Sequence, residues 1–355
     1  MTTDKSSPIR LAIVGSGNIA NTHAAAVEAI PEVSLRAVCS RNLEMAEKLA
    51  KPFGARVISS VEELVASEEI DAVLVATPSG AHADAVVPAL RAGKHVLCEK
   101  PLEVNSERVR VMIEEANRSG VILAGFFPLR QGAGAQAIRK ALDAGRFGRL
   151  TFISARVKWW RDLDYYRASK WRGTWALDGG GALMNQGIHA VDLLQWFGGR
   201  LTAVAAFADT LTHPGIEVED TLAATLRFAN GALGTLEATT SCYPGMDLSL
   251  EVSGEHGTAV LVNDRIDFWQ FAEEAPEDAH IRSGNLGGNI RGGSSDPRAI
   301  SSEGHRQQIV DFCRAIRGES QEFINGGEAA KAVSIVETIY RSVRSSRVEP
   351  ISYHS

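Results

Sequence analysis

The sequence predicts an α/β protein with two domains, a doubly wound parallel sheet followed by an α+β domain with an open, predominantly antiparallel sheet. With 355 residues, the chain is longer than one hydrophobic core usually serves. Between residues 9 and 127, short apolar runs alternate with stretches of helical spacing. After residue 148 the pattern changes to strands joined by short turns. We therefore place the two domains at residues 1–128 and 129–355.

The apolar runs of the first domain predict six strands. They are nearly continuous in Val, Ile and Leu, which is typical of strands buried on both faces. The stretches between them have helical spacing, and several end in glycine. Strands that alternate with helices predict a parallel sheet. The six predicted strands cover residues 9–15, 34–40, 56–59, 72–78, 95–100 and 121–127.

The second domain shows partial alternation of apolar and polar residues, which predicts strands with one buried face. Asn230-Gly231 and the segment 254–257 are hairpin-like turns, so neighbouring strands should be antiparallel. We expect one face of this sheet to cover the helix after residue 182 and the other to pack on a second subunit. The predicted strands cover residues 149–160, 201–210, 220–229, 232–243, 247–255, 257–263 and 265–271.

Composition excludes several classes of protein. The apolar fraction of 45% and the charged fraction of 23% are ordinary for a soluble globular protein. A net charge of −6 argues against nucleic-acid binding, and no apolar run is long enough to span a membrane. The N-terminus lacks a secretory pattern, and the cysteines lie far apart without a CxxC pair. We expect a cytoplasmic protein with reduced thiols at Cys39, Cys98, Cys242 and Cys313, and no bound metal.

The first turn predicts dinucleotide binding. The stretch Gly15-Ser16-Gly17-Asn18-Ile19-Ala20 is a G-x-G-x-x-A sequence between the first strand and the first helix. Gly15 allows the tight turn, Gly17 lets a pyrophosphate approach the backbone, and the helix N-terminus supplies N–H donors. A merely structural turn is the alternative. The candidate cofactor-binding residues here are Gly15, Gly17, Asn18 and Ile19.

The end of the second strand bears on the choice between NAD and NADP. NAD-selective sites usually place a carboxylate there for the ribose hydroxyls. This sequence has Ser40 and Arg41 instead, and a hydroxyl with a guanidinium suits a 2′-phosphate. An exposed arginine without a role is the alternative. We expect NAD or NADP, with a slight preference for NADP.

The fifth strand ends in Glu99-Lys100-Pro101, at the sheet edge where open α/β proteins bind their ligands. A lysine near a desolvating nicotinamide can have its pKa lowered and can serve in proton transfer. Most lysines at strand ends are simply solvated, so this motif gains weight only in combination with others.

A glycine-rich block at residues 178–189, "DGGGALMNQGIH", precedes a helix in the second domain. Asn185 and His189 are four residues apart and therefore share one helical face, with Asp192 three residues further on. The three consecutive glycines should let the backbone lie close to a ligand.

These motifs, in this order and spacing, resemble those of the Gfo/Idh/MocA oxidoreductases. They are "VGSGNIA", "ATPSGAHAD", "AGKHVLCEKPL" and "GGGALMNQGIHAVDLL". The resemblance implies a Rossmann domain, substrate held between two domains, a catalytic acid/base at Lys100 and a catalytic partner at His189. It also implies that Thr77, Pro78, His82 and Glu99 lie on the cofactor side. Members of this family commonly form dimers and tetramers through the C-terminal sheet.

One position departs from the common family pattern. Many members carry Asp four residues before the histidine, whereas this sequence has Asn185. The Asn–His version is similar to the branch that oxidises N-acetylated UDP-hexuronic acids at the sugar 3-position. Asn cannot exchange a proton at neutral pH, so proton transfer falls on Lys100 and His189, in an order that stays open. We expect Asn185 and Asp192 to contact substrate.

Residues 156–175 concentrate aromatic and basic side chains in an acidic protein. Aromatic faces suit the C–H face of a sugar, and arginines suit carboxylate or phosphate. A subunit contact would show the same enrichment. The predicted substrate contacts are Arg172, Trp171 and Tyr166, with Arg130 as a weaker candidate.

The Gly- and Ser-rich segment 283–301 predicts a loop, and the helix after it carries His305 near its start. We interpret His305 as part of a solvated helix cap. The sequence therefore predicts an NAD(P)-dependent dehydrogenase or reductase acting on a small-molecule sugar, as a homodimer or homotetramer. Two alternatives stay open, namely a glycoside hydrolase with tightly bound NAD and a non-catalytic NAD(P)-binding sensor.

Overall fold

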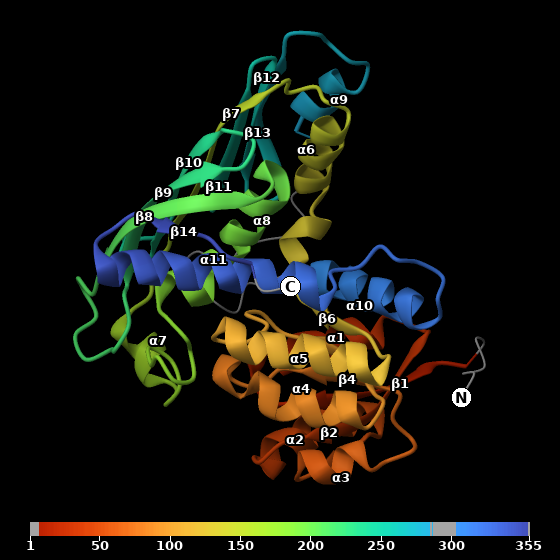
Figure 1. Ribbon diagram of the computed structural model, residues 1–355. Coiled ribbons are helices and arrows are strands. Elements are labelled where there is room, and N and C mark those ends of the chain that lie inside the picture. The colour runs from red at the N-terminus through yellow and green to blue at the C-terminus, as the bar shows by residue number, and fades with distance from the viewer. Residues whose placement is uncertain (1–6, 285, 287–302, 354–355) are drawn as a thin grey trace. The chain divides into compact units, whose positions relative to one another are not determined.

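A computed structural model describes residues 7–284, 286 and 303–353 of the chain (Figure 1). Contacts between Cα atoms divide it into two compact units. The first comprises Met1–Phe126 and Ser302–Ala330, and the second comprises Phe127–Ser301 and Lys331–His354. Most of the Gly- and Ser-rich segment 283–301 lies outside the described residues.

The first unit contains the predicted doubly wound parallel sheet, in the order β3-β2-β1-β4-β5-β6. Every pair of neighbouring strands in it is parallel. All six predicted strands are confirmed: β1 (Ile9–Val14), β2 (Val33–Cys39), β3 (Arg56–Ile58), β4 (Ala72–Val75), β5 (His95–Cys98) and β6 (Leu123–Gly125). The intervening helices are α1 (Asn18–Glu28), α2 (Leu43–Ala50), α3 (Val61–Val65), α4 (His82–Arg91) and α5 (Ser106–Ser119).

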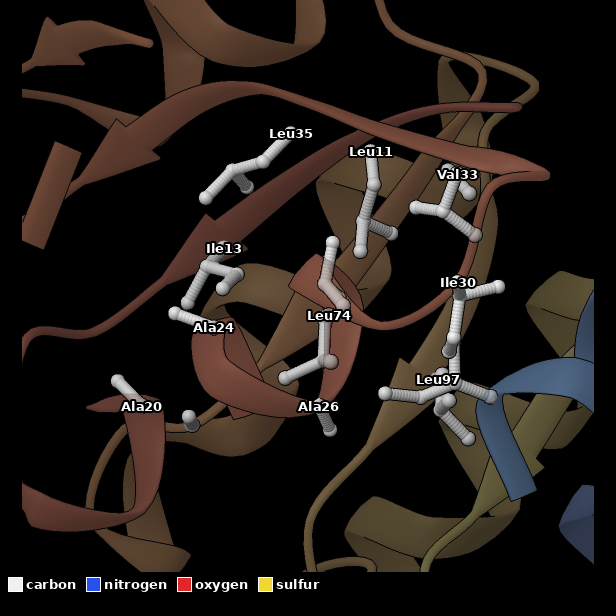
Figure 2. Close-up of a cluster of buried hydrophobic side chains, with 14 of the residues drawn as sticks. Leu11, Ile13, Ala20, Ala24, Ala26, Ile30, Val33, Leu35, Leu74 and Leu97 are labelled. Carbon is white, nitrogen blue, oxygen red and sulfur yellow. The ribbon is translucent and has the colours of Figure 1, made fainter. Parts of the chain in front are cut away.

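Small and branched apolar side chains form the core of this unit (Figure 2). Leu11 and Ile13 of β1 pack with Leu74 of β4 and Leu97 of β5, and each is at most 2% exposed. Ala20 and Ala24 of α1 belong to the same cluster, because an alanine brings the helix close to the sheet. This packing fixes the start of α1 against the end of β1, where the glycine turn lies.

Helix α10 (Glu303–Ile316) belongs to the first unit, which differs from the predicted boundary. The sequence placed all of residues 129–355 in the second domain. Ile309, Phe312 and Cys313 are buried in the first unit's core, and α10 packs on α1. The apolar face of α10 is therefore covered by a domain that precedes it by nearly two hundred residues, and local patterning carries no information about this.

The second unit contains an eight-stranded sheet in the order β13-β12-β11-β7-β10-β9-β8-β14. It is antiparallel except where β10 pairs with β7, as the fold class predicted. Asn230-Gly231 lies in the β9–β10 hairpin, where Gly231 has a φ of 90°. The strands are β7 (Leu150–Lys158), β8 (Leu201–Asp209), β9 (Thr221–Phe228), β10 (Leu233–Thr239), β11 (Ser249–Gly254), β12 (Gly257–Val262), β13 (Arg265–Phe271) and β14 (Glu349–Pro350).

Helices cover one face of this sheet. Helix α8 (Ile188–Gly198) packs on β7 and β11, and α6 (Ala133–Asp143) packs on β12 and β13. Side chains of the other face are exposed along β7, β8, β10 and β13. The long helix α11 (Gly326–Ser345) begins in the first unit and ends in the second. None of the helices in the described ranges is long and apolar enough to cross a membrane.

Candidate active site

The turn between β1 and α1 has the geometry of a dinucleotide-binding loop. Gly15 has a φ of 118°, and a Cβ there would overlap with the Ala76 carbonyl oxygen. Gly17 is the N-cap of α1, and a Cβ at that position would have no neighbour within 4 Å. Gly15 is thus required by the fold itself, whereas the open space at Gly17 leaves the α1 N–H groups accessible to an anion.

The side chain of Thr77, just after β4, supports cofactor binding at the carboxyl edge of the parallel sheet. Its hydroxyl is buried and has no hydrogen-bond partner within the described part of the chain. A buried hydroxyl is normally satisfied, so a ligand that supplies a partner is expected. The sequence placed Thr77 and Pro78 on the cofactor side, and the unsatisfied hydroxyl agrees with that position.

The end of β2 contains the predicted polar pair. The Ser40 hydroxyl lies 2.8 Å from the Ser16 hydroxyl, and Arg41 is exposed. Burial, aided by the charges of Glu62 and Glu63, raises the pKa of the Cys39 thiol to about 11.

The backbone of Lys100 is held through Glu99. The Glu99 carboxylate accepts hydrogen bonds from the Lys100 amide, at 3.0 Å, and from His23 Nε2 of α1, at 2.7 Å. Burial raises the pKa of Glu99, but the His23 hydrogen bond and the charges of His23, His305 and Lys100 outweigh this and bring it to about 2. Glu99 is therefore a permanent anion that anchors the segment carrying Lys100.

His82 holds the other side of the same segment. Its Nδ1 lies 2.9 Å from the Pro101 carbonyl oxygen, and its Nε2 lies 3.0 Å from that of Thr77. The ring is 1% exposed, so it connects the two strand-end loops and does not project toward solvent. His82 would therefore affect a cofactor indirectly, by holding Thr77 and Pro101 in position.

His305 is buried, contrary to the interpretation as part of a solvated cap. It is 4% exposed and its Nε2 lies 3.9 Å from Glu99 Oε1. His23, Glu99 and His305 offer ligand atoms within 4.8 Å of one another. However, the 2.7 Å separation of His23 and Glu99 is shorter than the roughly 3.3 Å between two ligands of a tetrahedral zinc ion. The geometry is that of a hydrogen bond between an imidazole and a carboxylate.

The glycine-rich block of the second unit forms a π-helical turn, Leu183–Gly187, that continues into α8. The sequence predicted a continuous α-helix, and π-turns are frequent at functional sites. From Asp178 to Gln195, Asn185 and His189 are the two residues that are not buried. Asn185 and His189 therefore lie on the accessible side of this segment, whereas Asp192, predicted on the same face, is buried.

Gly180 and Gly181 make room for protein side chains. A Cβ at Gly180 would overlap with the Tyr340 hydroxyl, and one at Gly181 would overlap with the Glu219 carbonyl oxygen. The Glu219 carboxylate accepts hydrogen bonds from the Gly181 and Leu183 amides, both at 2.9 Å, and from Tyr340. Burial raises the pKa of Glu219 to about 7 against these hydrogen bonds. Neither Glu219 nor Tyr340 carries a sequence signal, because both come from distant elements.

Tyr165 connects the aromatic–basic segment to the glycine-rich block. Its hydroxyl accepts a hydrogen bond from Gln186 Nε2 at 3.0 Å. The guanidinium carbons of Arg172 and Arg161 lie 4.3 and 5.3 Å from its ring centroid. Arg172 Nε is buried and has no hydrogen-bond partner within the described ranges. This arrangement offers positive charge beside the block that carries Asn185.

The other predicted substrate contacts lie in different surroundings. Tyr166 is buried, with its hydroxyl 2.8 Å from that of Thr240, whereas the neighbouring Tyr165 is half-buried. Trp171 is half-buried beside Arg172. Asp192 and Arg130 form a buried bidentate ion pair at 2.8 and 2.6 Å. That pairing gives both residues a structural role within the second unit, and their role toward substrate stays a prediction.

The fold and these residues define a nicotinamide-dependent dehydrogenase acting on CH–OH groups, with its glycine turn on a Rossmann sheet. The chain belongs to the Gfo/Idh/MocA oxidoreductase family. Residues 9–127 match "Oxidoreductase family, NAD-binding Rossmann fold", and residues 135–260 match "GFO/IDH/MocA C-terminal domain".

Individual relatives span nearly the same length. The WlbA dehydrogenase from Bordetella pertussis, solved in complex with NADH and UDP-GlcNAcA, is 34% identical with a TM-score of 0.90, covering 98% of this chain and 99% of its own. Inositol 2-dehydrogenase from Rhizobium meliloti is 27% identical over 96% of this chain and 98% of its own length. D-glucoside 3-dehydrogenase from Escherichia coli is 30% identical over 66% of this chain and 71% of its own.

Proposed function

We propose that the protein oxidises a hydroxyl group of an anionic, nucleotide-linked sugar, at the sugar 3-position. The observation that carries this proposal is the position of Arg161 and Arg172 around Tyr165, beside the block with Asn185 and His189. Two guanidiniums suit a carboxylate or a diphosphate better than a neutral polyol. The UDP-GlcNAcA complex of the Bordetella relative supports the same substrate class.

The chemistry assigned to the chain is proton transfer. A bound nicotinamide supplies the hydride acceptor for this reaction. Lys100 takes the hydroxyl proton, with His189 as its partner or relay, because imidazoles and lysines desolvated by a neighbouring nicotinamide can serve as general bases. Glu99 and His82 hold the Lys100 segment through hydrogen bonds on either side.

The cofactor is NAD or NADP. The NAD-binding match and the NADH complex of the Bordetella relative support NAD. Ser40 and Arg41 are the basis for the slight preference for NADP.

A substrate panel tests the proposal. Neutral sugars, polyols, uronates and UDP-sugars are offered with each cofactor, and turnover is read from the nicotinamide absorbance. We expect UDP-GlcNAcA to give a kcat/KM at least tenfold above any neutral monosaccharide. Turnover of neutral monosaccharides alone would contradict the proposal, and glycoside cleavage without net absorbance change would indicate a hydrolase.

We further propose that the open face of the second sheet packs on a second copy of this chain, forming a homodimer or homotetramer. Four large apolar side chains on this sheet are at least 40% exposed: Phe152, Phe207, Leu233 and Phe268. Phe207 is 82% exposed and sits opposite Ala223, which leaves a protruding ring beside a small residue. Such a mixed apolar face is typical of an oligomer interface.

Replacing Phe207 with Arg is expected to shift the protein toward monomer, because a guanidinium would be desolvated within the proposed interface. Sedimentation velocity at micromolar concentration measures this, and the melting temperature should change little for so exposed a position. Leu43→Arg, at a comparably apolar exposed position on α2, is the matched control. An unchanged sedimentation coefficient for Phe207→Arg and Phe152→Arg would contradict the interface.

A further inference from the structure

Asp178, the residue directly before the three glycines, is a buried carboxylate that contacts Asn185. It is 2% exposed. Its Oδ1 accepts a hydrogen bond from Asn185 Nδ2 at 2.7 Å, and its Oδ2 accepts one from the Gly173 amide at 2.9 Å. Both carboxylate oxygens are therefore engaged, one of them with the residue at which this chain departs from the common family pattern.

This contact determines the orientation of the Asn185 amide. A carboxylate can only accept, so the amide nitrogen must face Asp178, and the reverse orientation would bring two oxygens to 2.7 Å. A hydrogen bond to an ionised acceptor is about twice as strong as one between neutral groups. The amide carbonyl oxygen, which is an acceptor, therefore lies on the side of the amide that faces away from Asp178.

We propose that Asp178 is a positioning residue, which holds Asn185 so that its amide oxygen accepts from the hydroxyl group of the substrate. This inference rests on the proposed function, because it assigns the acceptor to the sugar hydroxyl. Asn185 and His189 are the two half-buried residues of the segment, so an acceptor fixed there faces the same side as the imidazole.

The same geometry explains why an amide occupies position 185. Aspartate there would place a second carboxylate against Asp178 at hydrogen-bond distance, and the pair would have to share a proton. In this chain the carboxylate is that of Asp178, seven residues before Asn185. Positions 178 and 185 therefore hold one carboxylate and one amide, and we expect that the two side chains can be exchanged.

An exchange of side chains tests the proposal, with UDP-GlcNAcA as the probe. Asp178→Asn should lower kcat by about 10- to 100-fold, because the amide loses its preferred orientation, while NADH affinity stays within twofold. Asn185→Asp should lower kcat more than Asp178→Asn does. Its kcat should fall further as the pH rises and the second carboxylate ionises. The double variant Asp178→Asn/Asn185→Asp should recover at least tenfold over Asn185→Asp.

The controls separate positioning from folding. Asp164→Asn makes the same chemical change on an exposed side chain of α7 (Leu163–Arg167), 87% exposed, and should leave kcat within twofold. Thermal melting identifies any variant that fails to fold. Wild-type kcat for Asp178→Asn, or no recovery in a folded double variant, would overturn the inference.

A ligand-free measurement separates this inference from the proposed function. The side-chain amide protons of Asn185, assigned by their absence in Asn185→Asp, should exchange with solvent at least tenfold faster in Asp178→Ala. Unchanged exchange would overturn the Asp178 contact. If wild-type protein binds NADH but turns over no sugar, the proposed function fails while the exchange result still decides the role of Asp178.

Discussion

Replacing Lys100 with Ala should lower kcat by more than about 10⁴-fold, beyond the range typical of one acid–base group. The substitution removes the group that takes the proton, and with it the positive charge that this group acquires as the proton is transferred. NADH affinity should stay within about threefold, because the Lys100 amide can still donate to Glu99. Single-turnover kinetics with UDP-GlcNAcA and fluorescence titration with NADH measure the two effects.

Lys48→Ala is the control for this experiment, since Lys48 is an exposed lysine of the same unit that pairs with Glu44. His189→Gln distinguishes the two candidate bases: a smaller loss than for Lys100→Ala assigns the primary role to the lysine. Retention of more than 1% of wild-type turnover in Lys100→Ala would remove the mechanism proposed for Lys100.

Local patterning was sufficient for the six strands of the first sheet and for β7 to β13 of the second, but not for β14. The six strands of the first sheet follow from continuous apolar runs, and the hairpin at Asn230-Gly231 follows from turn chemistry. Both are determined by residues close together in the sequence. The placement of α10 on the first unit is not, since its packing partners lie far away in the sequence.

Residues of the candidate site could be predicted where they belong to a local sequence motif that is typical of one kind of chemistry. Gly15 and Gly17 belong to this group, whereas the role of Lys100 stays a prediction. The residues that hold those motifs in place were not predicted. The role of a carboxylate such as Asp178 or Glu219 depends on the backbone amide or side chain that it contacts in the folded chain, and the sequence does not show that contact. Tyr165 and Tyr166 are adjacent, and only tertiary packing decides which one reaches Gln186.

Replacing Gly17 with Ala should abolish tight cofactor binding without destabilising the fold. Gly17 has φ −80° and ψ −173°, which alanine adopts readily, and no atom lies within 4 Å of the added methyl group. The melting temperature should therefore be unchanged or slightly higher, as the substitution restricts the unfolded chain by roughly 0.4–1 kcal/mol. NADH affinity should fall by at least about 100-fold, because the methyl group occupies the space through which a pyrophosphate approaches the α1 N–H groups.

Gly15→Ala provides the opposite result at a neighbouring position. Its positive φ and the overlap with the Ala76 carbonyl should destabilise the fold by roughly 1–3 kcal/mol or more, so that melting and binding fall together. Calorimetric melting and NADH titration on both variants separate the two roles. Unchanged NADH affinity in Gly17→Ala would show that the pyrophosphate does not approach this turn, and a lowered melting temperature there would contradict the open space at Gly17. We expect this contrast because a side chain at position 15 would overlap with the protein backbone, whereas a side chain at position 17 would overlap only with a bound ligand.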